Sequence, residues 1–310
     1  MISTNSNTAA VNRIPVIDTH IHFFDTRRPG GVPWPPKSDR ILYRPALPAR
    51  YRKLVKGLSV VGAIEIECSP LLEDNQWVLD VAAKDKLIAG TVGDLEPEAP
   101  EFPKNLERFQ RNPLFRGIRC GNLWGRNLSK QLSSPRFVSG LKLLADADLE
   151  MDTANPDPEL ISGVVRVTDK VPRLRVVIDH LPQLEPPSDA RTRRQLQANL
   201  HELGKRPQVY AKLSEVVHRV GGRVRSDLAL YRPRLDELCE IFGEDRVIYG
   251  SDWPNSDKSA PFRTELKVVR DYFAGKGTVA AEKFFWKNSF AAYRWIKRAP
   301  DQPQGTASRA

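Results

Sequence analysis

The sequence predicts an α/β fold of the (β/α)8 class, a TIM barrel formed by a single domain with a long loop insertion after the first strand. Eight strand-like apolar segments alternate with helix-like segments, which is typical of a parallel sheet covered by helices. The chain has 310 residues, and a barrel of roughly 250 residues with insertions accounts for this length. No Gly-x-Gly-x-x-Gly motif follows the first strand, so an open dinucleotide-binding sheet has no support.

The domain boundaries follow from composition. Residues 1–13 are polar and are predicted to be a flexible N-terminal segment, and residues 14–298 form the predicted barrel. From residue 299 to 310 the chain is rich in Pro, Gln, Gly and Ser, which predicts a disordered tail.

The first strand lies in the stretch 16–24, Val-Ile-Asp-Thr-His-Ile-His-Phe-Phe. A near-continuous apolar run is expected of a parallel strand buried on both faces. Side chains two residues apart in a strand point to the same side, so His20 and His22 should project together.

A long segment without regular structure is predicted at residues 25–50, because its many prolines are incompatible with a helix or a central strand. Long loops in compact domains are often functional. Since this one directly follows the His-x-His strand, we interpret it as a lid and expect Trp34 to face the substrate. The alternative interpretation of this segment is a flexible surface insertion without a role in substrate binding.

The other seven strands are predicted from short apolar runs. They are expected at residues 63–68, 87–93, 115–120, 149–153, 174–180, 209–214 and 246–252.

The helices are predicted from apolar residues at helical spacing. The helix at 74–84, for example, starts with Asp-Asn before the apolar Trp77, Val78, Val81 and Ala82. The others are expected at 51–60, 105–111, 135–147, 159–170, 192–205, 231–242, 262–274 and 280–296. The aromatic-rich last helix could close the barrel or form a dimer face, so a homo-oligomer is considered.

Polar residues whose side chains can take part in catalysis or binding lie at the ends of the predicted strands. Each alone could be structural, but the carboxyl ends of barrel strands meet at one mouth, where barrel enzymes keep their active sites. These residues are His20, His22, Arg119, Asp152, His180, Lys212, Ser214 and Asp252. His218 lies just past the seventh strand and is expected to reach the same site.

Charge and cysteine content narrow the class of protein. The net charge is +10, but the basic residues are scattered and no nucleic-acid-binding motif accompanies them, so no nucleic acid partner is expected. The three cysteines form no CxxC pair and fit a reducing compartment. No signal peptide and no run of about 18 apolar residues is evident, so we expect a cytoplasmic protein that does not bind membranes.

Four motifs together resemble the amidohydrolase superfamily. They are Asp18-Thr-His-Ile-His-Phe23, Phe115-Arg-Gly-Ile-Arg119, Val177-Ile-Asp-His-Leu181 and Gly250-Ser-Asp-Trp-Pro254. The chain is most similar to the lactonase branch, which includes L-fuconolactonases, L-rhamnonolactonases and 2-pyrone-4,6-dicarboxylate lactonases. After His180 this chain reads Leu-Pro-Gln-Leu instead of the usual Gly-Lys-Pro-like continuation.

The residues present disfavour a two-metal site. Its bridging ligand from the fourth strand would have to come from Arg116 or Arg119, and a guanidinium cannot lose its proton to bind metal. One divalent ion on His20, His22 and Asp252, with His180 nearby, fits a catalytic zinc site with an open position. The lactonase branch is also known to work without metal. We therefore expect either no cofactor or one divalent metal, Zn²⁺ being the best match, and prefer the metal-free reading.

The resulting hypothesis is opening of a sugar-acid or pyrone-type lactone ring. Asp252 is expected to be the general base on a water molecule. His20, His22 and His180 are expected to polarise the carbonyl group.

The substrate is expected to be a small lactone or carboxylate. The residues predicted to bind it are Arg119, Arg116, Asp152, Lys212, His218, Trp253 and Trp34. The first alternative is a metal-dependent hydrolase or decarboxylase of the same superfamily. A second alternative is a non-catalytic protein that binds a sugar acid.

Overall fold

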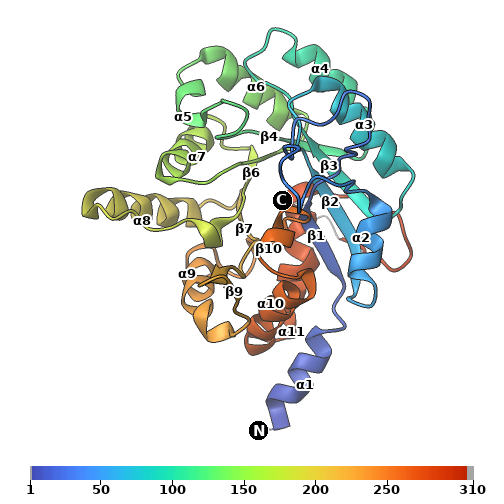
Figure 1. Ribbon diagram of the computed structural model, residues 1–310. Helices are drawn as coiled ribbons and strands as arrows, with labels where there is room; N and C mark the ends of the chain where they lie inside the picture. Colours follow the sequence, from blue (N-terminus) through green and yellow to red (C-terminus); the bar gives the residue numbers. More distant parts are fainter. Residues whose placement is uncertain (1, 306–310) are drawn as a thin grey trace.

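Eight parallel strands form one nearly closed sheet in the computed structural model, which describes residues 2–305 (Figure 1). The strands follow one another in chain order, and an isolated parallel bridge links Ile21, at the end of the first strand, to Trp253, in the segment after the last strand. They are β1 (Val16–Ile21), β2 (Val60–Ile66), β3 (Ile88–Gly93), β4 (Phe115–Arg119), β5 (Glu150–Asp152), β6 (Arg175–Ile178), β7 (Val209–Leu213) and β10 (Val247–Tyr249). The predicted (β/α)8 barrel is thereby confirmed.

Helices surround the sheet and alternate with its strands (Figure 1). They are α1 (Ile2–Val11), α2 (Pro48–Val55), α3 (Leu72–Ala83), α4 (Phe102–Gln110), α5 (Leu128–Gln131), α6 (Pro135–Asp146), α7 (Pro158–Lys170), α8 (Ala190–Gly204), α9 (Arg232–Phe242), α10 (Phe262–Lys276), α11 (Thr278–Glu282) and α12 (Asn288–Tyr293). Short 3-10 helices span Leu181–Gln183, Leu228–Leu230 and Asn255–Lys258. A small hairpin of β8 (Arg219–Val220) and β9 (Arg223–Val224) lies between β7 and α9.

The strands are buried on both faces because they separate two apolar layers. Every residue of β1, β3 and β7 is buried. The smaller layer joins Ile17, Ile64, Val177 and Ile248, and residues from strands so far apart in the sheet can meet only inside the barrel. The larger layer packs the outer strand faces against the helices.

Two departures from the predicted helices concern the ends of the chain. Helix α1 lies within the segment that the sequence predicts to be flexible, and it packs against α10 and α11, with Val11 fully buried. The flexibility of this segment stays a prediction. The predicted helix at 280–296 is divided into α11, a π-helical turn at Lys283–Lys287 and α12.

Within residues 299–305, part of the predicted disordered tail, the side chain of Gln302 is docked on the barrel, and the disorder of the tail stays a prediction. Gln302 is 1% exposed, and its amide donates hydrogen bonds to the carbonyl oxygens of Val61 and Lys86 while it accepts from the backbone N–H groups of Arg298 and Ala299. This part of the chain therefore docks on the amino ends of β2 and β3. The rest of the predicted tail lies outside the described residues.

The loop at 25–50 has no regular structure until α2 begins at Pro48. It folds back over the end of β1, since Phe24 bridges to Ala46 and Trp34 packs edge-on against the Phe24 ring at 5.4 Å. Its role as a lid stays a prediction. Among the described residues, no helix is both long and apolar enough to cross a membrane.

Candidate active site

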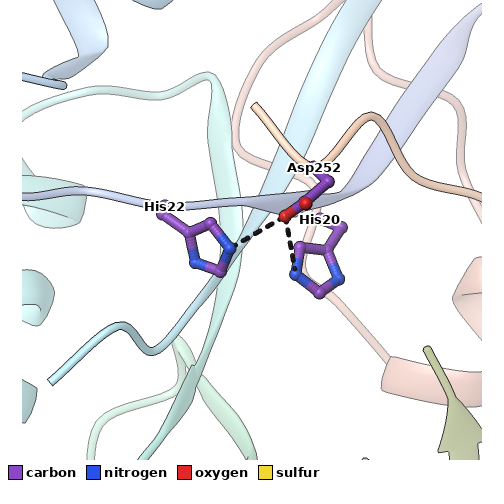
Figure 2. Close-up of side chains that lie close together, drawn as sticks. All are labelled: His20, His22 and Asp252. Carbon is purple, nitrogen blue, oxygen red and sulfur yellow. Dashed lines mark hydrogen bonds and ion pairs between the residues drawn. The ribbon is translucent and has the colours of Figure 1, made fainter. Parts of the chain in front are cut away.

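One carboxylate oxygen lies between two imidazoles at the carboxyl ends of the first and last strands. Oδ1 of Asp252 is 2.9 Å from Nε2 of His22 and 3.3 Å from Nε2 of His20 (Figure 2). His20 and His22 project to the same side because they are two residues apart at the end of β1. The predicted convergence of residues from opposite ends of the chain is present.

The hydrogen bonds of His22 define its tautomer. Its Nδ1 lies 2.8 Å from the carbonyl oxygen of Ile66, which can only accept, so Nδ1 carries the hydrogen. A neutral ring then turns the lone pair of Nε2 toward the carboxylate. A contact of 2.9 Å between these atoms requires a positive centre, either a proton on Nε2 or a cation near Asp252.

His180 completes the cluster from the adjacent part of the barrel. Its ring centroid is 4.5 Å from that of His20, and its Nδ1 lies 2.8 Å from Oγ of Ser214. Burial lowers the pKa of His180, although the nearby Asp252 and Asp179 act in the opposite direction. His180 is therefore neutral at physiological pH, with Nε2 free to act as a ligand or a hydrogen-bond partner.

Asp252 stays ionised because of its neighbours. Burial alone would raise its pKa, but His180, His22 and His20 outweigh this effect and hold the pKa well below its usual range. Its second oxygen accepts a hydrogen bond of 2.8 Å from the amide of Asn255.

A buried ionic layer supports the imidazoles from below. Nζ of Lys212 is fully buried and lies 2.8 Å from Asp152, 2.7 Å from Asp179 and 3.2 Å from Nδ1 of His20. Burial alone would lower the pKa of Lys212, but the two carboxylates raise it. Lys212 is thus a cation that holds His20 in place.

Above this layer the barrel opens into a hollow of about 570 Å³ that is continuous with solvent. The side chains around it come from the loops that follow the strands. They are His22, Trp34, Cys68, Arg119, Leu123, Trp124, Asn155, Pro156, Asp157, His180, Gln183, Glu215, Asp252 and Asn255.

Five of the residues singled out in the sequence line this pocket: His22, His180, Asp252, Arg119 and Trp34. His20 lies directly beneath it, fully buried against Asp252. The indole of Trp34 packs edge-on against His22 with 5.6 Å between ring centroids.

Asp152 and Lys212 do not reach the pocket, contrary to their predicted role as substrate ligands. Both are fully buried, and Asp152 is occupied by Lys212 and by the hydroxyl of Tyr293 at 2.8 Å. A position at a strand end does not reveal how deep a side chain lies, and these two form part of the floor.

Arg116, His218 and Trp253 are likewise not placed in the pocket. Arg116 lies near the opposite end of β4, where it donates a hydrogen bond to the carbonyl oxygen of Pro113. His218 is exposed and packs against Tyr231. Trp253 is 1% exposed and packs against Tyr51, so it is a core residue.

The most important residue that the sequence analysis missed is Glu215. It directly follows Ser214, lines the pocket, and accepts a short hydrogen bond from the amide of Gln183. Burial, with Asp252 nearby, raises its pKa to about 8. Its position one residue beyond a strand-end serine is the signal that could have found it.

The cluster fits a divalent metal. Zinc bound at about 2.0–2.2 Å from tetrahedral ligands spaces those ligand atoms about 3.3–3.6 Å apart. The 3.3 Å between His20 and Asp252 matches this spacing, and the 2.9 Å between His22 and Asp252 would have to lengthen by about 0.4 Å. His20, His22 and Asp252 form one group with suitable spacing, and His180, Glu215 and Asp252 form another.

Comparison with known proteins agrees with this geometry. A family model described as amidohydrolase matches residues 17–295. An L-fucono-1,5-lactonase from Burkholderia ambifaria is 29% identical over 246 residues, which cover 79% of this chain and 82% of the relative.

Two solved structures share the fold. A zinc-bound amidohydrolase from Burkholderia multivorans has a TM-score of 0.78 at 21% identity and covers 91% of this chain and 100% of its own. A putative 2-pyrone-4,6-dicarboxylic acid hydrolase from Pseudomonas putida has a TM-score of 0.70 at 19% identity, with 91% of this chain and 98% of its own covered.

Proposed function

Because the chain belongs to the amidohydrolase family, we propose that it is a hydrolase that opens a lactone ring. The observation that carries the proposal is the meeting of three imidazoles and an ionised carboxylate at the floor of an open pocket. The relative named L-fucono-1,5-lactonase supports this choice of reaction.

Asp252 is the proposed general base. Its low pKa keeps it ionised, and it lines the pocket where a water molecule can reach it. It accepts a proton as the water oxygen attacks the lactone carbonyl carbon. When the tetrahedral intermediate collapses, the ring C–O bond breaks and that proton passes to the leaving alkoxide oxygen. General-base catalysis of this kind typically accelerates a reaction by roughly 10²–10⁴-fold.

The imidazoles are the proposed electrophilic groups. As the carbonyl oxygen becomes an oxyanion, hydrogen-bond donors already aimed at it lower the barrier. His180 lines the pocket and can donate from Nε2, because its Nδ1 is engaged with Ser214, while His22 and His20 position Asp252.

The charges around the pocket favour an uncharged, hydroxyl-rich lactone over a carboxylate-bearing one. Arg119 is the only basic side chain other than histidine among the described residues that line it. Its guanidinium is already engaged, 3.3 Å from Asp179 and 3.8 Å from Glu67, and its Nε donates to the carbonyl oxygen of Thr153. The described side chains that line the pocket therefore leave no unpaired guanidinium or ammonium group for a dicarboxylate.

Aromatic and polar side chains in the pocket suit a sugar lactone. Trp34 and Trp124 offer apolar faces for the ring, and Asn155, Gln183 and Asn255 offer amides for its hydroxyl groups. A divalent metal held by His20, His22 and Asp252, with His180 nearby, would act as a Lewis acid and lower the pKa of bound water.

A pH-indicator screen tests this proposal. Purified protein, chelated and metal-loaded in parallel, is offered aldonolactones, 2-pyrone-4,6-dicarboxylate and hydroxybenzoates. We expect acid release with one or more aldonolactones and none with the pyrone dicarboxylate. Decarboxylation of a benzoate, or hydrolysis of the pyrone alone, would contradict the proposal.

A further inference from the structure

We propose that His180, Glu215 and Asp252 form a divalent-cation site on the pocket floor, with Glu215 as a ligand. The inference deepens the proposed function, since it concerns the same pocket. Its test measures metal binding without turnover, so the failure of one can be distinguished from the failure of the other.

The three residues come from neighbouring strands and share an unusual backbone. They follow β6, β7 and β10, which are adjacent in the sheet. Each has a left-handed conformation, with φ of 52° at His180, 50° at Glu215 and 58° at Asp252. Residues other than glycine rarely adopt it, and where they do, the strain is often associated with function. Here the same positive φ occurs at three neighbouring strand ends, each of which carries a ligand-type side chain.

The side chains are close enough to share an ion. One ligand atom from each of the three lies within 4.8 Å of the others. Two carboxyl groups this close need a positive charge or a shared proton between them. An imidazole with two carboxylates is a donor set that zinc and similar divalent ions accept in catalytic sites, where further positions stay open.

Each of the three is also held by a second group. Ser214 lies 2.8 Å from Nδ1 of His180, Gln183 donates to Glu215, and Asn255 donates to Asp252 at 2.8 Å. Metal-binding residues characteristically have such outer partners, which orient the ligand atom toward the ion.

The site differs from the group formed by His20, His22 and Asp252. His20 is fully buried and is absent from the pocket lining, whereas His180, Glu215 and Asp252 all line it. An ion bound by the latter three is therefore within reach of a substrate. Asp252 is the one residue common to both groups, so His180 and Glu215 on one side and His20 and His22 on the other distinguish them.

Metal binding to chelator-treated protein tests the proposal. Co²⁺ is titrated by its visible absorption, and Zn²⁺ affinity is measured by equilibrium dialysis. We expect wild type to bind Co²⁺ and Glu215→Gln to bind it at least about 10-fold more weakly, with an altered spectrum. Glu65→Gln is the matched control, since Glu65 is a buried carboxyl (1% exposed) that faces a separate cavity. It should keep the wild-type affinity within about 3-fold.

Three results would overturn the proposal. The first is that Glu215→Gln binds Co²⁺ as tightly as wild type. The second is that wild type binds no Co²⁺ even when the metal is in 100-fold molar excess. The third is that His20→Asn loses as much Co²⁺ affinity as Glu215→Gln. The last would assign the ion to the His20 group. If Glu215→Gln does not fold by circular dichroism, Glu215→Asp, which keeps the charge but retracts the carboxylate, should weaken binding in the same direction.

Discussion

At the scale of the residue, Asp252 concentrates several roles in one side chain. Its Oδ1 is close to both His20 and His22, and its Oδ2 is bonded to Asn255. Burial of an anion is costly unless it is paired and hydrogen-bonded. The surrounding imidazoles reduce this cost and at the same time keep the carboxylate ionised and able to act as a base.

Replacement of Asp252 should separate activity from stability. We expect Asp252→Asn to lower kcat of lactone hydrolysis by about 10²–10⁴-fold, because the amide cannot accept the proton of water. The protein should stay folded, because the amide keeps the size of the side chain, but the melting temperature should fall, because a carboxylate with a lowered pKa stabilises the fold. Asp257→Asn, which changes a carboxylate paired with Arg50 outside the pocket lining, is the control. Turnover within about 10-fold of wild type in Asp252→Asn would remove it from the base role.

Residue positions were predictable where a simple periodicity governs them. Alternation along a strand predicted that His20 and His22 share a side, and the strand-end rule predicted that His180 and Asp252 join them. The same rule could not distinguish pocket from floor. Lys212 fits every sequence criterion for a substrate ligand, yet it is buried because Asp152 and Asp179 can neutralise it there.

At the scale of the element, close packing of the outer helices depends on small residues. Gly204, the last residue of α8, lies against α9, and a Cβ atom added there would be 2.3 Å from the carbonyl oxygen of Ile241. Gly275 in α10 faces open space.

These two glycines make a matched pair of alanine substitutions. Gly204→Ala should lower the free energy of unfolding by about 1–3 kcal/mol, because a backbone atom must move. Gly275→Ala should raise it by up to about 1 kcal/mol, because alanine favours the helix. Urea unfolding of both variants is the measurement. Equal effects of the same sign would contradict the packing described.

Element order was predictable because strand and helix patterns differ in period. The structure at the two ends of the chain was not predictable, because these segments pack against residues that are remote in the sequence. Gln302 lies in a segment whose composition is typical of a disordered tail, but its amide is hydrogen-bonded to the carbonyl oxygens of Val61 and Lys86 at the amino ends of β2 and β3. Composition alone does not reveal such acceptors.

At the scale of the whole molecule, buried carboxyl groups couple stability to pH. Glu265 on α10 is 1% exposed, and burial, with Glu215 nearby, raises its pKa well above 4.5. The N–H of Val216, at 3.2 Å from Oε1, acts in the opposite direction but does not outweigh burial. The folded protein therefore keeps a proton on Glu265 that the unfolded chain releases.

Stability should consequently fall as the pH rises. A raised folded-state pKa contributes stability below the unfolded pKa of 4.5 and loses it progressively as the pH approaches the folded value. Relative to Glu265→Gln, wild type should lose roughly 1–3 kcal/mol of unfolding free energy between about pH 5.5 and pH 8. Urea titrations at both pH values measure this. A difference between the two proteins that does not change with pH would mean that Glu265 is ionised in the fold.

The closure of the barrel between Ile21 and Trp253 has a consequence for biosynthesis. His20 leaves the ribosome long before Asp252 is translated, about 10–50 s earlier at usual elongation rates of roughly 5–20 residues per second. A nascent chain thus carries its first histidines without their carboxylate partner. The group of His20, His22 and Asp252 can therefore form only after residue 252 has been synthesised, so an ion or substrate that needs all three side chains binds after that point.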